Sequence, residues 1–316
     1  MEKAVLPAVP IAASSAPSLA LDPSLATWGV LGALVTAMLA IDLVVFARDH
    51  APSLREAAAW SVVWLAVAAG FGVLFWAWQG GEAGGQFFAG YLLERTLSLD
   101  NVFVFAVIMA YFAVPAAVQP KVLSWGIALA LVLRLVLILA GATLLDTFHA
   151  TFYVFGALLL FTAWKLVRRE GQEAPPDRNR ALRLLPRRLR SKPLVVVFVV
   201  VATTDLVFAV DSIPAIFAVT SEPFVVFAAN AFAMLGLRAL YFLLADLKDR
   251  FDFLRHGLAV ILAFVGLKML TDKWFHIPVG VSLGVIALVL GVSIFVSIRY
   301  DRAAGGGLER ADAHDD

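Results

Sequence analysis

The chain is organised as long apolar runs separated by short polar breaks. Nine of these runs are long enough, or nearly long enough, to cross a hydrocarbon layer as helices, which takes about 20 residues. They cover residues 25–47, 57–78, 87–112, 122–144, 151–166, 194–220, 223–245, 257–274 and 279–299. The pattern therefore predicts an all-α, polytopic membrane protein with about nine transmembrane helices, in a single membrane domain over residues 25–300.

The polar segments outside this domain predict three extramembrane parts. Residues 1–24 are rich in Ala, Pro and Ser and are expected to form an N-terminal tail. Residues 167–193 form an arginine-rich loop that divides the chain into halves. Residues 301–316 contain three consecutive glycines and a mixed, acidic end, which predicts a disordered tail.

The distribution of basic residues predicts the orientation. With the N-terminus outside, about nineteen Lys and Arg residues fall on one side of the membrane, and only Lys3 and Lys273 fall on the other. This positive-inside bias places the N-terminus outside, and the 167–193 loop and the C-terminus in the cytoplasm. An odd number of spans agrees with termini on opposite sides.

Composition restricts the chemistry. Hydrophobic residues make up 61% of the 316 residues and charged residues only 16%, with a mean hydropathy of +0.88, whereas soluble domains carry about 25% charged residues. Cysteine is absent, which excludes disulfides, thiolate metal sites and thiol nucleophiles. A bound metal would be held by oxygen ligands or by the five histidines, which favours hard ions.

Two segments of the chain resemble each other. Glu94 is followed six residues later by Asp100-Asn101, and Asp205 is followed six residues later by Asp211-Ser212. The likeness continues downstream, where Leu133-Arg134 matches Leu237-Arg238 and Lys165 matches Lys268. This predicts a 3+3 repeat, with spans 3–5 at about 87–166 and spans 6–8 at about 194–274. Because three spans are an odd number, the second copy is expected to be inverted, as in many secondary transporters.

Several carboxylates are predicted at membrane depth, where an ionised Asp costs about 2.5–3.5 kcal/mol. Such groups must be paired, protonated or in contact with water, so as a set they indicate a function. Arg134 and Arg238 lie in mid-span and are available as partners. A single Asp–Arg pair can also be a buried salt bridge that only fixes helix register. The acids are Asp42, Glu94, Asp100, Asp205 and Asp211.

These residues predict an oxygen-ligand site for a hard divalent cation. Helical spacing places Glu94, Ser98 and Asn101 on one face, and Asp205 with Ser212 on another. The two acids of each motif do not share a face, so they serve different parts of the path or the helix is unwound. Pro214 favours local unwinding of the sixth span. The expected metal ligands are Asp100, Asp211, Asn101, Ser212, Glu94, Asp205, Ser98 and Asp42, with Arg134, Arg238 and Lys268 in charge pairing or gating.

The quoted segments also resemble a known family. ERTLSLDNVFVFAVI, ATTDLVFAVDSIPAIFAVT and AFVGLKML are similar to the signature segments of the TerC family of bacterial membrane proteins. The resemblance runs from about the first to the ninth span. It implies membership of the LysE-like exporter superfamily and a role in manganese(II) export or balance, with links to tellurite resistance and alkaline stress. The acidic and polar motif of the family falls on Glu94, Ser98, Asp100, Asn101, Asp205, Asp211 and Ser212, without departure.

The resulting expectation is a manganese(II) exporter of the bacterial cytoplasmic membrane that works by proton exchange. It would not be an enzyme, would require no cofactor, would bind no nucleic acid, and would have the transported cation and the lipid bilayer as its partners. Two other classes stay open: a membrane partner for metallation or folding of exported proteins, and a resistance factor that does not itself transport. An intramembrane aspartyl protease is disfavoured because the Gly-x-Gly-Asp context is missing.

Overall fold

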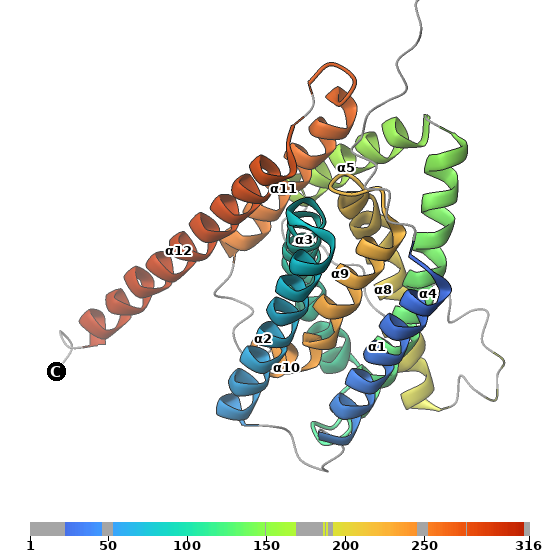
Figure 1. Ribbon diagram of the computed structural model, residues 1–316. Coiled ribbons are helices and arrows are strands. Elements are labelled where there is room, and N and C mark those ends of the chain that lie inside the picture. Colours follow the sequence, from blue (N-terminus) through green and yellow to red (C-terminus); the bar gives the residue numbers. More distant parts are fainter. Residues whose placement is uncertain are drawn as a thin grey trace, which may run out of the picture.

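The computed structural model is helical in the ranges that it describes, which are residues 23–45, 53–148, 150–168, 186, 188, 192–244, 252–275 and 277–312 (Figure 1). No strand occurs in these ranges. The N-terminal tail and most of the 167–193 loop lie outside them. The helices are α1 (Leu25–Val45), α2 (Leu54–Gln79), α3 (Gly81–Tyr111), α4 (Gln119–Thr147), α5 (Ala150–Arg168), α8 (Pro193–Phe217), α9 (Pro223–Leu235), α10 (Leu237–Leu244), α11 (Asp252–Thr271) and α12 (Val279–Asp312).

Seven helical segments of the described chain are long and apolar enough to cross a membrane, which confirms an integral membrane protein. They match seven of the predicted spans, with α9 and α10 together forming one of them. The other two predicted spans, 87–112 and 257–274, are also present as helices. These two helices are not among the seven for separate reasons. Helix α3 carries the charged residues Glu94, Arg95 and Asp100 in its middle, and the apolar stretch of α11, His256–Thr271, is short.

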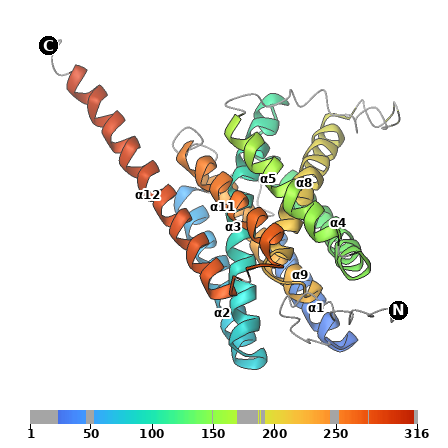
Figure 2. The same ribbon diagram turned by 90° about the horizontal axis from the view of Figure 1, so that it is seen from above.

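The helices pack around α3 and α8, which contribute to both apolar cores. One core joins them to α1, α2, α4, α9 and α10, and the other joins them to α5, α11 and α12. The span formed by α9 and α10 is completely buried, so it is surrounded by protein and not by lipid. In both views α12 projects beyond the other helices toward the C-terminus (Figures 1 and 2).

The central helices α3 and α8 run antiparallel. Gln86 of α3 accepts a hydrogen bond from Thr220, which follows α8. One turn further along α3, a Cβ atom at Gly90 would lie 3.1 Å from Ile216. One turn further again, Glu94 and Ser212 both contact the same arginine. Each step of four residues along α3 is thus matched by four residues back along α8.

The helix break expected at Pro214 is wrong. Helix α8 continues through Pro214 to Phe217, because a proline in the last turn leaves most of the helical hydrogen bonds in place. The break lies instead at Gly236, between α9 and α10. There the Arg95 side chain donates a hydrogen bond to the carbonyl of Ala233 at 2.9 Å, and a cation at the C-terminus of a helix is favourable.

Helix α12 continues past Tyr300 to Asp312. The disordered tail expected over residues 301–316 stays a prediction. Residues 313–316 lie outside the described ranges.

Helices α5 and α11 approach each other through two glycines. A Cβ atom at Gly156 would lie 3.0 Å from the carbonyl oxygen of Gly266, and one at Gly266 would lie 2.9 Å from that of Gly156. The neighbouring atoms are backbone and cannot move independently. Close approach of this kind through small residues is a common way to pack membrane helices.

We expect Gly266→Ala to force α5 and α11 apart and to lower stability by about 1–3 kcal/mol, as overpacking does. Gly291→Ala in α12 is the matched control, because no atom lies within 4 Å of its added Cβ. Thermal unfolding of the purified protein in detergent measures the difference. Equal melting temperatures for the two variants would show that the glycine contact does not constrain the helices.

Candidate functional site

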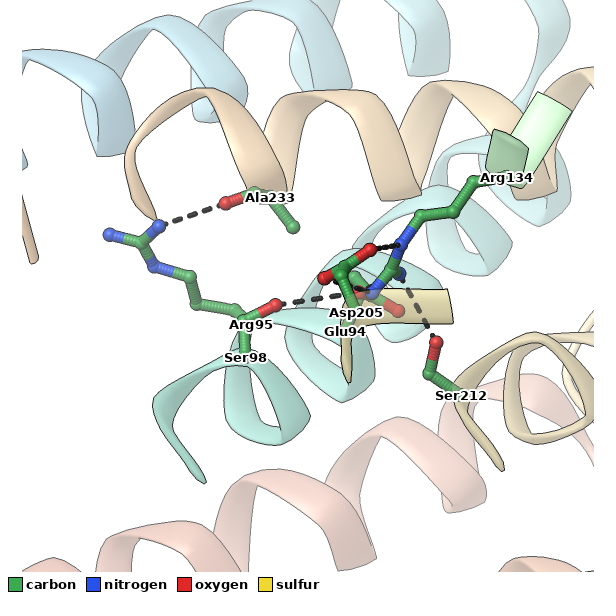
Figure 3. A network of polar contacts seen from close by, with 7 residues as sticks. All are labelled: Glu94, Arg95, Ser98, Arg134, Asp205, Ser212 and Ala233. Atoms are coloured by element: carbon green, nitrogen blue, oxygen red, sulfur yellow. Dashed lines mark hydrogen bonds and ion pairs between the residues drawn. The ribbon is translucent and has the colours of Figure 1, made fainter. Parts of the chain in front are cut away.

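A single buried arginine on α4 joins α3, α4 and α8. Arg134, 1% exposed, donates through Nε and Nη2 to the two carboxylate oxygens of Asp205, at 3.1 and 3.2 Å (Figure 3). Its Nη1 forms an ion pair with Glu94 and donates to Ser212 Oγ at 3.2 Å. The guanidinium therefore has a forked contact with one acid and a single contact with the other.

The acids of this cluster outnumber its bases. Glu94 and Asp205 are both buried, and Arg134 is the base that contacts them in the described chain. Ser98 donates to Glu94 Oε1 at 3.4 Å, and Glu94 Oε2 has no hydrogen-bond partner. With both carboxylates ionised, the cluster carries one uncompensated negative charge. In a low-dielectric setting such a charge favours a further cation or a proton.

The predicted helical faces agree with these contacts. Asp205 and Ser212 were placed on one face of their helix, and both contact Arg134. Glu94 and Ser98 were placed together on α3, and they form a hydrogen bond. Asn101, expected on the same face, is buried, with 4% of its surface exposed.

Asp211 points to a different part of the molecule. Its Oδ1 accepts a hydrogen bond from Thr162 of α5 at 3.0 Å, and the residue is partly buried. Asp205 lies six residues, or about 9 Å of helical rise, further back along α8. The prediction that the acids of one motif do not share a face fits this arrangement.

Asp100 lies on α3, but its side chain is outside the described part of the structure. Among the described side chains, no three His, Cys, Asp or Glu residues come together as a metal-binding group. In this conformation Arg134 occupies the space between Glu94 and Asp205.

The second mid-span arginine belongs to another cluster. Arg238 at the start of α10 forms a 2.8 Å ion pair with Asp42 of α1 and also contacts Ser124 of α4. Arg238 also contacts the backbone carbonyl of Asp42. Asp42, Arg238 and Ser124 are all buried. The structure therefore places Asp42 with Arg238 and not with Arg134.

Lys268 also lies away from the central acids. It is 6% exposed and donates to Ser282 of α12 at 3.1 Å. It lines a cleft, together with Thr220, Ser221 and Asp272, on the face of the bundle where α8 ends and α9 begins. Of the predicted charge-pairing residues, only Arg134 contacts the Glu94 and Asp205 carboxylates in the described chain.

Two uncharged polar residues were missed at the sequence level. Gln86 on α3 and Asn230 on α9 are both 0% exposed. Gln86 accepts a 2.5 Å hydrogen bond from Thr220, but its Nε2 has no partner, and neither amide atom of Asn230 has one. An amide within an apolar run is a weaker signal of a functional site in the membrane than an ionisable group, and it is the signal by which both residues could be found in the sequence.

The sequence model of the family described as "Integral membrane protein TerC family" matches residues 79–304. The chain is similar to a protein of Escherichia coli K12 named "Putative membrane-bound redox modulator Alx", with 41% identity over 313 residues covering 88% of this chain and 97% of the relative. It is also similar to an uncharacterized membrane protein of Myxococcus xanthus, with 42% identity over 297 residues covering 88% and 93%. No solved structure gives a significant match.

We expect Arg134→Met to destabilise the protein by about 3–5 kcal/mol, because it leaves two buried carboxylates without their base. Adding Glu94→Gln and Asp205→Asn to that variant should restore most of the loss, since no buried charge is then left. Denaturant unfolding in detergent micelles measures both effects, with Arg55→Met, at an exposed position of α2, as control. A triple variant no more stable than Arg134→Met would contradict the electrostatic explanation.

The turn between α8 and α9 provides a pH-dependent group. Burial, together with the nearby Asp146 carboxylate, raises the pKa of Glu222 to about 6. Folding therefore favours the protonated form, and this contribution to stability is lost as the pH rises through about 6. Glu222→Gln should melt like the unmodified protein at pH 4, below the ordinary pKa of a glutamate, and at a higher temperature at pH 7. Glu82→Gln, at an exposed carboxylate, is the control, and a difference that does not change with pH would refute the assignment.

Proposed function

The chain belongs to the TerC family of integral membrane proteins, and from this premise we propose that it exports manganese(II) from the cytoplasm. The observation that carries the proposal is the cluster of Glu94 and Asp205 around Arg134. A buried salt bridge that only fixes register needs one acid for each base. Here a second carboxylate is kept in a site that its excess charge destabilises, which is the mark of a cation path.

The ligand types support a hard divalent cation. The cluster contains carboxylate and hydroxyl oxygens, and the chain has no thiolate to select a softer metal. We propose that the ion displaces Arg134 from the two carboxylates. The proposed ligands along the path of the ion are Glu94, Ser98, Asp100, Asn101, Asp205, Asp211 and Ser212, with Asp211 apart from the Arg134 cluster, beside Thr162. Manganese in particular, and the LysE-like superfamily, are taken from the family resemblance.

We propose different roles for the charged residues around the ion. Asp100 and Asp211 would be the main ligands, while Glu94 and Asp205 would exchange the ion for protons or for Arg134. Arg134 would stabilise the empty site while the carrier returns to the conformation that loads the ion. Asp42 would hold Arg238 apart from the central carboxylates, which agrees with their 2.8 Å ion pair.

Alternating access would use the two halves of the chain. We propose that α3–α5 and α8–α11 form an inverted repeat, with the N-terminus outside and the C-terminus in the cytoplasm. The antiparallel course of α3 and α8 supports this arrangement, as does the position of the acid cluster between them. The partner helices also correspond, because α3 packs on α9 and α4 packs on α8. In such carriers the binding site lies at the interface of the repeats.

Proton exchange is the proposed driving reaction. Carboxylates buried at membrane depth hold protons more readily than exposed ones, and protons and metal ions compete for the same oxygens. A proton entering from outside would release the ion. Export by this route makes the protein a carrier and not an enzyme, and it requires no cofactor.

The name of the E. coli relative suggests a second function, in redox modulation. This chain has no cysteine, so it cannot itself carry out thiol–disulfide exchange. An indirect effect, through the metal supply of other proteins, is compatible with export. A role as a partner in metallation or folding would instead leave purified protein without transport activity.

We expect purified protein in vesicles to move manganese(II) down an imposed gradient, with a coupled pH change reported by an enclosed dye. Asp100→Asn and Asp211→Asn should each abolish the flux while still inserting, because each removes a charged ligand. Glu82→Gln is the control, at an exposed carboxylate at the start of α3.

Normal flux in either aspartate variant would reject its ligand role. Flux without a pH change, with the membrane potential clamped, would reject proton exchange. Absence of flux from the unmodified protein would favour the partner role.

A further inference from the structure

Three uncharged polar side chains are buried between the central acids and one face of the bundle. Gln86, Thr220 and Asn230 are 0%, 3% and 0% exposed. A buried polar group without a partner costs about 1–3 kcal/mol, and three amide atoms of Gln86 and Asn230 have none. Apolar side chains would fill these positions at lower cost, so a role for the polar atoms has to be sought.

The contacts of Gly90 show how far along the helix axes these residues lie. A Cβ atom at this glycine of α3 would lie 3.1 Å from Ile216 and 3.2 Å from Ala229, so α3 meets α8 and α9 at this level. Gln86 is one turn from Gly90 toward the start of α3, and Glu94 is one turn in the other direction. Asn230 follows Ala229 directly. Its height along the bundle is therefore within about 8 Å of both Gln86 and Glu94.

The side of α9 on which Asn230 lies can be inferred from the helices that the other sides of α9 contact. An aromatic contact joins Phe227 to Trp28 of α1, and another joins Phe232 to Phe71 of α2. Ala229 faces α3. At 100° per residue, Asn230 lies on the remaining side of α9, toward α4, with which α9 also packs. Helix α4 carries Arg134.

Of the three polar residues Gln86, Thr220 and Asn230, Thr220 reaches an open cleft. Thr220, Ser221, Lys268 and Asp272 line this cleft, on the face that the proposed orientation makes external. Thr220 Oγ donates to Gln86 Oε1 at 2.5 Å. Neither the amide of Asn230 nor Oε2 of Glu94 has a hydrogen-bond partner.

We infer that Gln86, Thr220 and Asn230 form a neutral subsite for a partly hydrated divalent cation, between the central acids and the external cleft. The Gln86–Thr220 hydrogen bond closes it in this structure. Amide and hydroxyl oxygens are hard ligands without net charge. These neutral oxygens can bind an ion after it leaves the carboxylates, but weakly enough to release it again. Stepwise conduction requires binding of this strength. The inference rests on the proposed export function and adds its exit route.

The absence of cysteine allows a direct test. The full-length protein is assayed in right-side-out membrane vesicles, with a positively charged methanethiosulfonate reagent added to the outside. Asn230→Cys should react with this reagent at least ten times faster than Ala231→Cys. Ala231 is the matched control because it is the next residue of α9 and is also 0% exposed, but faces away from α4. Gln86→Ala in the Asn230→Cys protein should speed labelling further by removing the closing bond. Equal rates at 230 and 231 would overturn the inference.

Protection by ions separates this inference from the proposed function. Manganese(II) should slow labelling at position 230, which supports both. Slowing by magnesium or calcium but not by manganese would support the subsite and reject manganese as the substrate. Labelling that no divalent ion slows, or manganese flux in vesicles that survives Asn230→Leu unchanged, would overturn the subsite and leave the export function standing.

Discussion

The buried guanidinium of Arg134 is the interaction on which the centre of this protein depends. A full positive charge at membrane depth is tolerated only where acids, backbone carbonyls or water face it, and at Arg134 the acids come from α3 and α8. The need to keep Glu94 and Asp205 close to Arg134 fixes the rotation of three helices at once. The same need brings two carboxylates to one base at the meeting point of α3, α4 and α8.

Three arginines in the membrane part of the chain are satisfied in three different ways. Arg134 has two carboxylates, Arg238 has Asp42 and Ser124, and Arg95 donates to the carbonyl of Ala233 at the end of α9. The last contact lies beside the break at Gly236, where the guanidinium of Arg95 is 3.0 Å from the position of an added Cβ atom. Each arginine therefore ties a helix end or a helix face to a partner that is distant in sequence.

The two apolar cores meet at α3 and α8, and the polar groups follow the line of these two helices. Asp211 faces α5 on the side of the second core, whereas Ser212 faces Arg134. Gln86 and Thr220 continue the polar row toward the cleft. A path for an ion along α3 and α8 would therefore run where the two apolar cores meet.

The helical class, the approximate spans and the residues whose burial needs an explanation could all be predicted from the sequence. These properties are local: the length of an apolar run and the spacing of Asp205 and Ser212 on one helix do not depend on neighbours. The tertiary structure was needed to show that Arg134 binds acids from two helices, that Asp42 binds Arg238, and that Asn230 is buried without a hydrogen-bond partner. It also placed the helix break at Gly236 instead of Pro214. Such pairings depend on how helices are rotated and shifted against one another, and many distant contacts set those quantities together.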